Sequence, residues 1–282
     1  MEARDQVLIT ATELAALIDA RDPVTVLDVR WRVDRPDGRA DHLQGHLPGA
    51  VYVSLEDELS DHTIVGRGRH PLPSGRSLEV AARKWGVRQD GLVVVYDDWN
   101  RAGSARAWWV LTAAGLDKVR ILDGGLSAWL SAGRSLDTGP VDPEPGNVTV
   151  PHDDLYAGSR ATLTAEQIGA VTLLDARAPE RFRGDVEPLD PVAGHIPGAK
   201  NLPSVAVLAG DGTFIGDDAL TQLLSGRGID RDGGVGVYCG SGVTAAVTVA
   251  ALAATGREAA LYPGSWSEWC SDPTRPVARG PE

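Results

Sequence analysis

Cysteine is scarce in this sequence, and long apolar runs are absent. Only Cys239 and Cys270 occur among 282 residues, so at most one disulfide could form, and neither lies in the Cys-x-x-Cys spacing typical of metal ligands. No apolar run reaches the roughly 18 residues of a transmembrane helix, and residues 1–5 lack the features of a secretory signal. We therefore expect a cytoplasmic protein with free thiols, no bound metal and no membrane partner.

Basic residues are also outnumbered. The chain has 27 lysines and arginines against 39 aspartates and glutamates, which gives a net charge of −12. Sequence-independent binding of nucleic acid needs a basic surface that faces phosphates, so the composition excludes nucleic acid as a partner class. The acidity either keeps the protein in solution or recruits a protein acceptor, and composition alone favours the first.

What the sequence does contain is an internal repeat. Four blocks recur in the same order at shifts of roughly 140 to 150 residues, which indicates a duplicated domain. They are residues 24–30 and 171–177, 45–50 and 194–199, 92–97 and 234–239, and 124–129 and 264–269. The segment between the copies concentrates proline, glycine and acid, which is typical of an extended linker. We expect an N-terminal domain over residues 1–137, a linker over 138–150 and a C-terminal domain over 151–282.

Both halves have a similar predicted order of helices and strands. Thr10 with Glu13, and Thr164 with Gln167, have the spacing of a capping box, and each pair precedes an apolar helical stretch. Short apolar strands then alternate with helices. This alternation predicts an α/β fold in each domain, with a mostly parallel sheet flanked by helices on both faces.

The second half carries a cysteine at the carboxyl end of a predicted strand. Residues 235–238 read as a buried strand and residues 244–254 as a helix closed by Gly256, with Cys239 between them. Open α/β sheets place their ligands at this edge. Gly240 and Gly242 allow unusual backbone dihedrals, so N–H groups can converge on the sulfur and favour a thiolate or a persulfide anion. The alternative is a small core cysteine beside a simple turn.

The first half lacks this chemistry. Asp97 stands where the second half has Cys239, and the glycine pattern is also missing. We therefore expect the second domain to be catalytic and the first to be non-catalytic. Cys270 follows Trp269 in an aromatic segment, where a buried and inert thiol is the ordinary interpretation.

Several motifs together resemble the tandem-domain rhodanese superfamily of sulfurtransferases over nearly the whole chain. Those motifs are residues 45–50 and 194–199, residues 106–109 and 123–129, and residues 259–269. The loop Cys239-Gly-Ser-Gly-Val-Thr244 is similar to that of 3-mercaptopyruvate sulfurtransferases. Thiosulfate-preferring members usually carry basic residues just after the cysteine, where this chain has Gly240 and Ser241. Mercaptopyruvate is therefore the expected donor.

The resemblance implies a reaction and a set of site residues. The Cys239 thiolate would take sulfur from the donor as a persulfide and pass it to cyanide, a thiol or a thioredoxin-like acceptor, with no cofactor. Ser241 matches the family's catalytic serine, although a loop-capping hydroxyl is the alternative. The donor would be bound by the residues that follow the cysteine and by an arginine, namely Gly240, Gly242, Val243, Thr244 and Arg181.

The resemblance is incomplete at the second donor-binding arginine. Asp190 occupies that position, so the usual pair of guanidinium groups is missing unless Arg183 or an arginine of the first domain takes its place. Arg177 is expected to pair with Asp175 instead.

In mercaptopyruvate enzymes the serine is linked across the domain cleft to a histidine and an acid. His70 matches the histidine, and Glu56 or the neighbouring Asp57 matches the acid. A lone loop histidine is equally often an ordinary surface residue. His46 and His195 lie in tight turns and are expected to be structural.

Three other functions compete with this interpretation. Thiosulfate could be the donor, or the protein could be a persulfide carrier without a small donor of its own. A Cys-x5-Arg phosphatase would need an arginine six positions after the cysteine, and this chain has Ala245 there.

Overall fold

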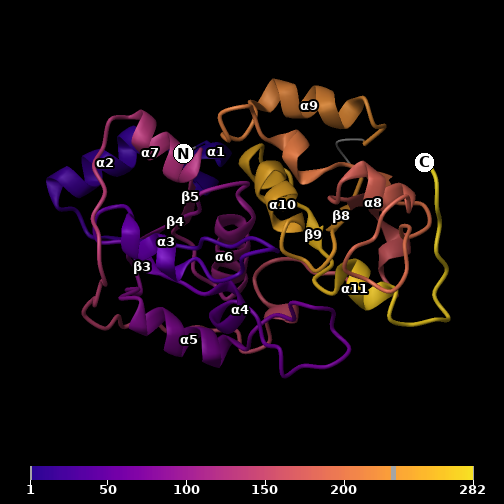
Figure 1. Cartoon of the computed structure of the whole chain (residues 1–282), viewed down its shortest axis with the longest axis horizontal. Coiled ribbons are helices and arrows are strands. Elements are labelled where there is room, and N and C mark those ends of the chain that lie inside the picture. The colour runs from indigo at the N-terminus through magenta and orange to yellow at the C-terminus, as the bar shows by residue number, and fades with distance from the viewer. Residues whose placement is uncertain (1, 230–232, 282) are drawn as a thin grey trace.

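The structure is a computed structural model that describes residues 2–229 and 233–281. It folds into two α/β units that lie side by side, the first on the left of Figure 1 and the second on the right. Each unit has its own parallel sheet, of five strands in the first and four in the second. The expected fold class, two tandem domains with helix-flanked parallel sheets, is confirmed.

In the first unit, strands and helices alternate along most of the chain. Its strands are β1 (Leu8–Ile9), β2 (Val24–Asp28), β3 (Val51–Tyr52), β4 (Leu92–Tyr96) and β5 (Val119–Leu122). Its helices are α1 (Ala3–Val7), α2 (Ala11–Ala20), α3 (Arg39–Gln44), α4 (Leu55–Glu58), α5 (Gly75–Lys84), α6 (Ala102–Ala113) and α7 (Gly125–Ser131).

The second unit repeats this order with shorter elements. Its strands are β6 (Thr172–Asp175), β7 (Lys200–Asn201), β8 (Val235–Tyr238) and β9 (Ala260–Leu261). Its α-helices are α8 (Pro179–Arg183), α9 (Asp217–Ser225), α10 (Ala245–Ala254) and α11 (Ser265–Trp269). Three 3-10 turns, η1 (Leu155–Ala157), η2 (Ile168–Ala170) and η3 (Ser204–Val207), complete it.

The two sheets have matching topologies. The first has the strand order β1-β5-β4-β2-β3 and the second β7-β6-β8-β9, and the strand pairs in both are parallel. The register aligns Asp28 with Tyr96 in the first sheet and Asp175 with Tyr238 in the second. The next residues along the chain, Asp97 and Cys239, therefore leave their sheets at equivalent positions.

Helices α6 and α10 join the two units. All residues of α6 and nearly all of α10 are buried, and the two helices pack against each other near the centre of Figure 1. A helix that is apolar on every side is stable only when other elements surround it. One continuous hydrophobic core contains Trp108 of α6 and Val247 of α10. The interface is therefore packed like a domain interior.

Residues 138–150 contain no helix or strand, as their proline and glycine content predicts. The segment is nevertheless fixed to the first unit, because the backbone N–H of Gly146 donates to the Arg83 carbonyl at 2.7 Å and that of Asn147 to the Val87 carbonyl at 3.1 Å. The domain boundaries at residues 137 and 151 stay a prediction.

One sequence-based expectation about the fold is wrong. The Thr10 capping box begins α2 as predicted, with both reciprocal bonds to Glu13 present. Thr164 and Gln167 have the same spacing, and the Thr164 N–H bonds the Gln167 side chain at 2.9 Å, but only the 3-10 turn η2 follows. The strand β6 starts at Thr172, so the segment is too short for two helical turns and contains Gly169, a poor helix former.

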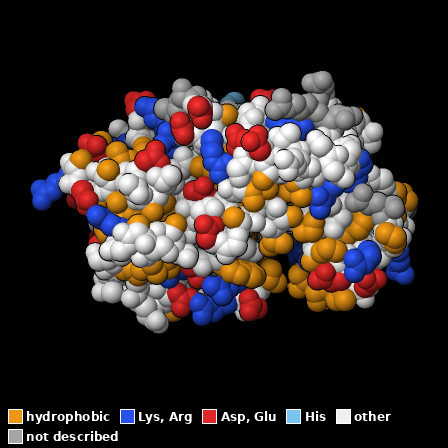
Figure 2. Space-filling view, turned by 90° about the horizontal axis from the view of Figure 1, so that it is seen from above, with side chains coloured by type: hydrophobic (Ala, Val, Ile, Leu, Met, Phe, Trp, Pro, Cys, Tyr) orange, Lys and Arg blue, Asp and Glu red, His pale blue; other side chains and the backbone are white. Residues whose placement is uncertain are grey.

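The surface carries charges of both signs. On the face shown in Figure 2, acidic and basic side chains are interspersed rather than gathered into one field. Within the described residues, no helix combines the length and apolar character needed to cross a membrane.

The two capping-box sequences provide a matched test of helix capping. Thr10→Ala removes a hydroxyl that accepts from the Glu13 N–H at 3.1 Å, and we expect it to lower the free energy of unfolding by about 1 kcal/mol. Thr164→Ala, which begins no α-helix, is expected to cost less than half of that. Denaturant unfolding of both variants measures the difference, and an equal loss would contradict the assignment.

Candidate active site

Cys239 lies directly after β8 and is almost fully buried, with 1% of its surface exposed. Its backbone N–H donates to the Ser265 hydroxyl at 3.1 Å, and its carbonyl accepts from the Trp266 N–H at 3.0 Å. The first two residues of helix α11 therefore hold the backbone of Cys239 in place. Burial alone would also fit a core cysteine, so its surroundings decide its role.

The loop after Cys239 uses its two glycines differently. Gly242 has a φ of +77°, and a Cβ there would lie 2.4 Å from the Pro263 carbonyl oxygen, so it needs glycine for both its dihedral and its space. Gly240 has no positive φ, which corrects the expectation for that residue. A Cβ on Gly240 would lie 2.9 Å from Arg69 Nη2, so glycine is needed there because a guanidinium approaches closely.

The backbone N–H groups of this loop are available to a ligand. Among the described residues, those of residues 240 to 244 donate to no backbone or side-chain acceptor. Val243 packs into the core and Thr244 stands at the N-terminus of α10. Successive free N–H groups at a helix N-terminus favour a negative charge.

In the first unit a carboxylate fills the equivalent place. Asp97 accepts from the backbone N–H groups of Trp99 at 3.0 Å, Arg101 at 3.2 Å and Ser104 at 3.1 Å. It also accepts from the Ser104 hydroxyl at 2.7 Å and forms an ion pair with Arg101 at 2.9 Å. The donors that the second unit leaves open are occupied here by the chain itself.

Three predicted residues from both units meet in one hydrogen-bonded chain. Ser241 Oγ lies 2.7 Å from His70 Nδ1, and His70 Nε2 lies 3.2 Å from Glu56 Oε1. Trp31 Nε1 donates to the same Glu56 oxygen at 2.6 Å. His70 is buried, so it is not the surface residue that the alternative supposed. The hydroxyl of Ser241 faces the imidazole rather than capping its own loop.

The carboxylate that bonds His70 belongs to Glu56 and not to Asp57. The backbone N–H of Asp57 bonds the Ser54 hydroxyl, which caps α4, and the Asp57 carboxylate accepts from that same hydroxyl at 2.7 Å. Consecutive helical residues point in different directions, so only one of the two carboxylates can reach His70.

The ionisation states of Glu56 and His70 determine which atoms donate in the hydrogen bonds that link Ser241, His70 and Glu56. The hydrogen bond with His70 lowers the pKa of Glu56 to about 2, so Glu56 is ionised and can only accept. His70 Nε2 must therefore carry the hydrogen. Burial lowers the pKa of His70, so its ring is neutral at physiological pH and Nδ1 accepts from the Ser241 hydroxyl.

Residues 66–70 hold His70 against the second unit. Gly68 has a φ of +81°, and a Cβ there would lie 2.4 Å from the Gly264 carbonyl oxygen. The backbone N–H of Arg69 donates to the Ser267 hydroxyl at 3.0 Å. The loop therefore lies directly on the N-terminal turn of α11, which also fixes Cys239.

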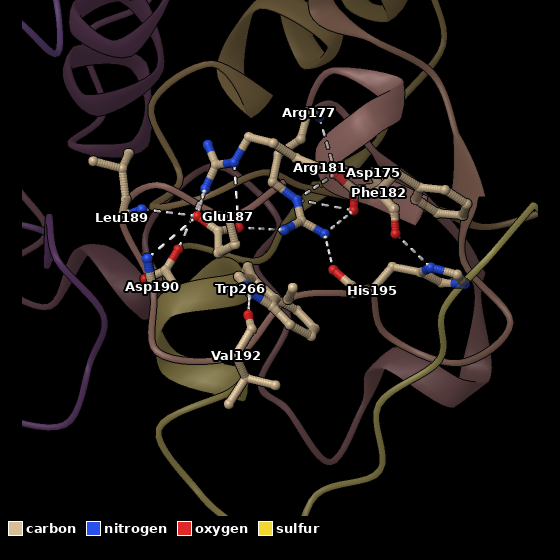
Figure 3. A network of polar contacts seen from close by, with 12 residues as sticks. Asp175, Arg177, Arg181, Phe182, Glu187, Leu189, Asp190, Val192, His195 and Trp266 are labelled. Atoms are coloured by element: carbon tan, nitrogen blue, oxygen red, sulfur yellow. Dashed lines mark hydrogen bonds and ion pairs between the residues drawn. The ribbon is translucent and has the colours of Figure 1, made fainter. Parts of the chain in front are cut away.

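Two guanidinium groups meet beside Gly240. A Cβ at Gly240 would lie 2.9 Å from Arg69 Nη2 and 3.5 Å from Arg181 Nη1. Asp190 pairs with Arg69. It also pairs with Arg181 at 3.4 Å, while Glu187 bonds Arg181 at 2.6 Å (Figure 3). Asp190 thus orients two arginines where the resemblance led us to expect an arginine in its own place.

The remaining candidates lie elsewhere. Arg183 pairs with Asp185 at 2.8 Å on the surface, and Arg177 pairs with Asp175 at 2.6 Å below the site. His46 and His195 are buried in their turns, where Nδ1 of each contacts a backbone carbonyl. Cys270 is buried, and burial raises its pKa to about 11, as expected of an inert thiol.

Sequence reasoning allowed for an arginine of the first domain but did not identify it as Arg69. Its partner Asp190 lies 121 residues away, so no local pattern connects the two. The available signal was the adjacency of Arg69 to His70, which places it at the domain interface once His70 is assigned.

Comparison with known proteins decides the family. A profile described as the rhodanese-like domain matches residues 10–132 and again residues 160–272. The chain belongs to the rhodanese family. As a rhodanese-family protein with both domains present, it is a sulfurtransferase, and this expectation from the sequence is confirmed.

The similar relatives carry the names of two donors. SseB of Mycobacterium tuberculosis, which bears a thiosulfate sulfurtransferase name, is 74% identical over 282 residues, which covers 99% of each chain. The 3-mercaptopyruvate sulfurtransferase of Escherichia coli is 37% identical over 272 residues, covering 94% of this chain and 95% of that protein. The crystal structure of SseA from Escherichia coli, described as a 3-mercaptopyruvate sulfotransferase with the rhodanese fold, superposes with a TM-score of 0.80 at 36% identity, over 92% of this chain and 98% of that one.

The hydrogen bond between His70 and Glu56 predicts a pH effect. Burial lowers the His70 pKa and Glu56 partly raises it again, so Glu56→Gln should lower the His70 pKa further. Protonation, which stops Nδ1 from accepting, then occurs at lower pH. We expect the acid-side fall of kcat/KM to move to lower pH, and the plateau of kcat/KM to drop about tenfold to a hundredfold because His70 loses its charged partner.

Asp57→Asn is the matched control, because the Asp57 carboxylate bonds Ser54 rather than His70. It should leave the pH profile of sulfur transfer unchanged. An acid-side fall that moves to higher pH in Glu56→Gln, or an equal loss in both variants, would contradict the arrangement.

Proposed function

We propose that this sulfurtransferase takes sulfur from 3-mercaptopyruvate, carries it as a persulfide on Cys239 and passes it to a thiol, cyanide or thioredoxin-like acceptor. The observation that carries the donor assignment is the Ser241, His70 and Glu56 chain. A pyruvate enolate leaving group must gain a proton to become pyruvate, whereas sulfite leaves thiosulfate without gaining one. A buried proton relay beside the nucleophile is therefore useful for mercaptopyruvate and unnecessary for thiosulfate.

The first step balances without a cofactor. The Cys239 thiolate attacks the donor sulfur, an S–S bond forms, and the C–S bond breaks with its electron pair passing into the enolate of pyruvate. The Ser241 hydroxyl, bonded to His70, supports the developing enolate and supplies its proton. The proton of the donor's sulfhydryl replaces the one delivered, so the enzyme is left with a persulfide anion and the donor becomes pyruvate. An acceptor thiolate or cyanide then attacks the outer sulfur and restores the Cys239 thiolate.

Arg181 and Arg69 are proposed to bind the charged end of the donor. Both guanidinium groups approach Gly240, next to the nucleophile, and each keeps N–H donors beyond those used by Asp190 and Glu187. Gly242, Val243 and Thr244 complete the loop around the sulfur. A carboxylate and a sulfonate would both suit this pair of arginines, so they do not select the donor.

Thiosulfate is the second candidate donor. It is favoured by the name of the Mycobacterium tuberculosis relative, and the arginines beside Gly240 are compatible with it as they are with mercaptopyruvate.

A cytoplasmic location also suits the proposal, because a reducing compartment keeps the Cys239 thiol free. No cation follows in the loop at Ala245, which lies buried in α10, so the alternative of a Cys-x5-Arg phosphatase has no support.

Steady-state kinetics with both donors test the proposal, with cyanide as the acceptor. We expect a higher kcat/KM for mercaptopyruvate than for thiosulfate, activity abolished in Cys239→Ser and retained in the control Cys270→Ala. Ser241→Ala should reduce kcat/KM for mercaptopyruvate by about a hundredfold, and for thiosulfate by less than about fivefold.

Each other outcome would change the assignment. A higher kcat/KM for thiosulfate, together with equal sensitivity of both donors to Ser241→Ala, would contradict mercaptopyruvate as the donor. Absence of turnover with either donor would favour a persulfide carrier that receives sulfur from another protein.

The role of Arg69 has its own test. Arg69→Gln removes a charged hydrogen-bond donor, so we expect the donor KM to rise about tenfold to a hundredfold with little change in kcat. Arg183→Gln, which removes an arginine paired with Asp185 on the surface, should leave KM unchanged.

An exchanged pair separates the position of the charge from its presence. Arg69→Asp combined with Asp190→Arg keeps the ion pair and moves the guanidinium to the other domain. We expect the double variant to reverse most of the rise in donor KM that Arg69→Asp alone causes. An unchanged KM in Arg69→Gln would show that Arg181 binds the donor without this partner.

A further inference from the structure

Arg106 is a fully buried arginine that reaches from the first domain to the active-site loop of the second. It projects from α6 and has 0% of its surface exposed. Its Nη2 donates to the carbonyls of His70 at 3.0 Å and Leu59 at 3.1 Å, and its Nη1 to the carbonyl of Gly242 at 3.4 Å. It therefore touches both sides of the interface, at the histidine of the relay and at the loop of Cys239.

The charge of Arg106 has no carboxylate partner. The other buried arginines, Arg30, Arg101 and Arg177, each pair with an aspartate at 2.6 to 3.0 Å. In the described part of the chain, no carboxylate lies within ion-pair distance of Arg106, and its Nε has no hydrogen-bond partner. Burial lowers its pKa to about 10, which still leaves it protonated at neutral pH. A buried cation without an anion is costly, so an anion nearby would be strongly stabilised.

Three groups that can carry negative charge interact electrostatically with the Arg106 guanidinium: Glu56, Tyr156 and Cys239. Glu56 is already bonded by His70, Trp31 and His62. Burial raises the pKa of Tyr156, so its hydroxyl stays neutral. Cys239 is the one of the three whose negative charge the proposed reaction needs, and Arg106 is bonded to its loop at the Gly242 carbonyl.

Two further cations lie close to Cys239 but differ in kind. Arg69 and Arg181 approach Gly240, yet each is paired with Asp190 or Glu187, and 32% and 19% of their side chains are exposed. Solvent and these carboxylates screen their charge. Neutral His70 adds none.

We propose that Arg106 is the counter-charge of the Cys239 thiolate, supplied by the first domain to make the cysteine of the second domain reactive. The same charge stabilises the persulfide anion. This inference rests on the proposed function only in taking Cys239 as the reacting residue. It assigns Arg106 an electrostatic and positioning role rather than contact with substrate.

Alkylation of Cys239 by iodoacetamide tests the proposal without any sulfur donor. The rate is measured against pH in a Cys270→Ala background, so that one thiol reports. We expect Arg106→Gln to lower the rate at neutral pH about tenfold to a hundredfold and to move its rise to higher pH. Arg106→Lys keeps the charge and should recover most of the rate. A role in packing alone would predict equal loss in both variants.

Two controls address general effects. Arg160→Gln removes an arginine whose guanidinium carbon lies 4.4 Å from the ring centre of Trp108, a residue of α6 like Arg106. It should leave the pH profile of alkylation unchanged. Arg183→Gln removes a cation that is paired with Asp185 on the surface, and it should change the rate by less than about threefold. If Arg106→Gln is folded and follows the wild-type profile, or if Arg183→Gln has the same effect, the proposal is overturned.

A second pair of variants provides a further test that leaves Arg106 in place. Cys239→Asp places a carboxylate, ionised at neutral pH, where the thiolate would lie, and Cys239→Asn is its neutral match. We expect Cys239→Asp to be the more stable of the two at neutral pH, with the difference lost as pH falls and the carboxylate is protonated. Equal stability, or a less stable Cys239→Asp, would overturn the proposal. Because neither arm uses a donor, a failure here is distinct from a failure of the proposed sulfur transfer.

Discussion

The contact between His70 and Ser241 joins the two domains where the chemistry takes place, and the rest of the site depends on it. The close approach of Gly68 to α11 and the bonds of Arg106 to both sides hold that contact in position. Arg69 reaches the loop of the second domain from the same segment. If the interface opened, the Ser241 hydroxyl would lose its hydrogen-bond partner, and the loop of Cys239 would lose the first-domain arginines beside it. The packed α6 and α10 helices keep it closed.

The duplication explains how the two halves came to differ. Both sheets end in a loop whose N–H groups can surround an anion, because both place that loop between a buried strand and a helix N-terminus. In the first half the Asp97 carboxylate occupies those donors permanently. In the second half, Cys239 leaves the corresponding donors without an acceptor among the described residues. The first half then contributes through its helix and loops, by supplying His70, Glu56 and Arg106 to its neighbour.

Much of the fold followed from local pattern and repetition. The repeat predicted two equivalent sheets, and the position of Cys239 followed because strand and helix patterns on either side of it are strong. The prediction of a helix after Thr164 was wrong because the spacing of capping residues does not indicate how many residues remain before the next strand. Gly240 was given the wrong reason, because glycine chosen for space and glycine chosen for dihedral look alike in sequence.

Contacts between the domains were harder to predict. Glu56 and Asp57 are adjacent, and only the orientation of α4 shows which one faces His70. The pairing of Arg69 with Asp190 depends on how the two halves dock, which no local pattern records. The most direct test of the account is the mass of peptides from protein treated with mercaptopyruvate. We predict one added sulfur atom on the peptide that contains Cys239 and none on that of Cys270; sulfur on Cys270, or on neither peptide, would contradict the account.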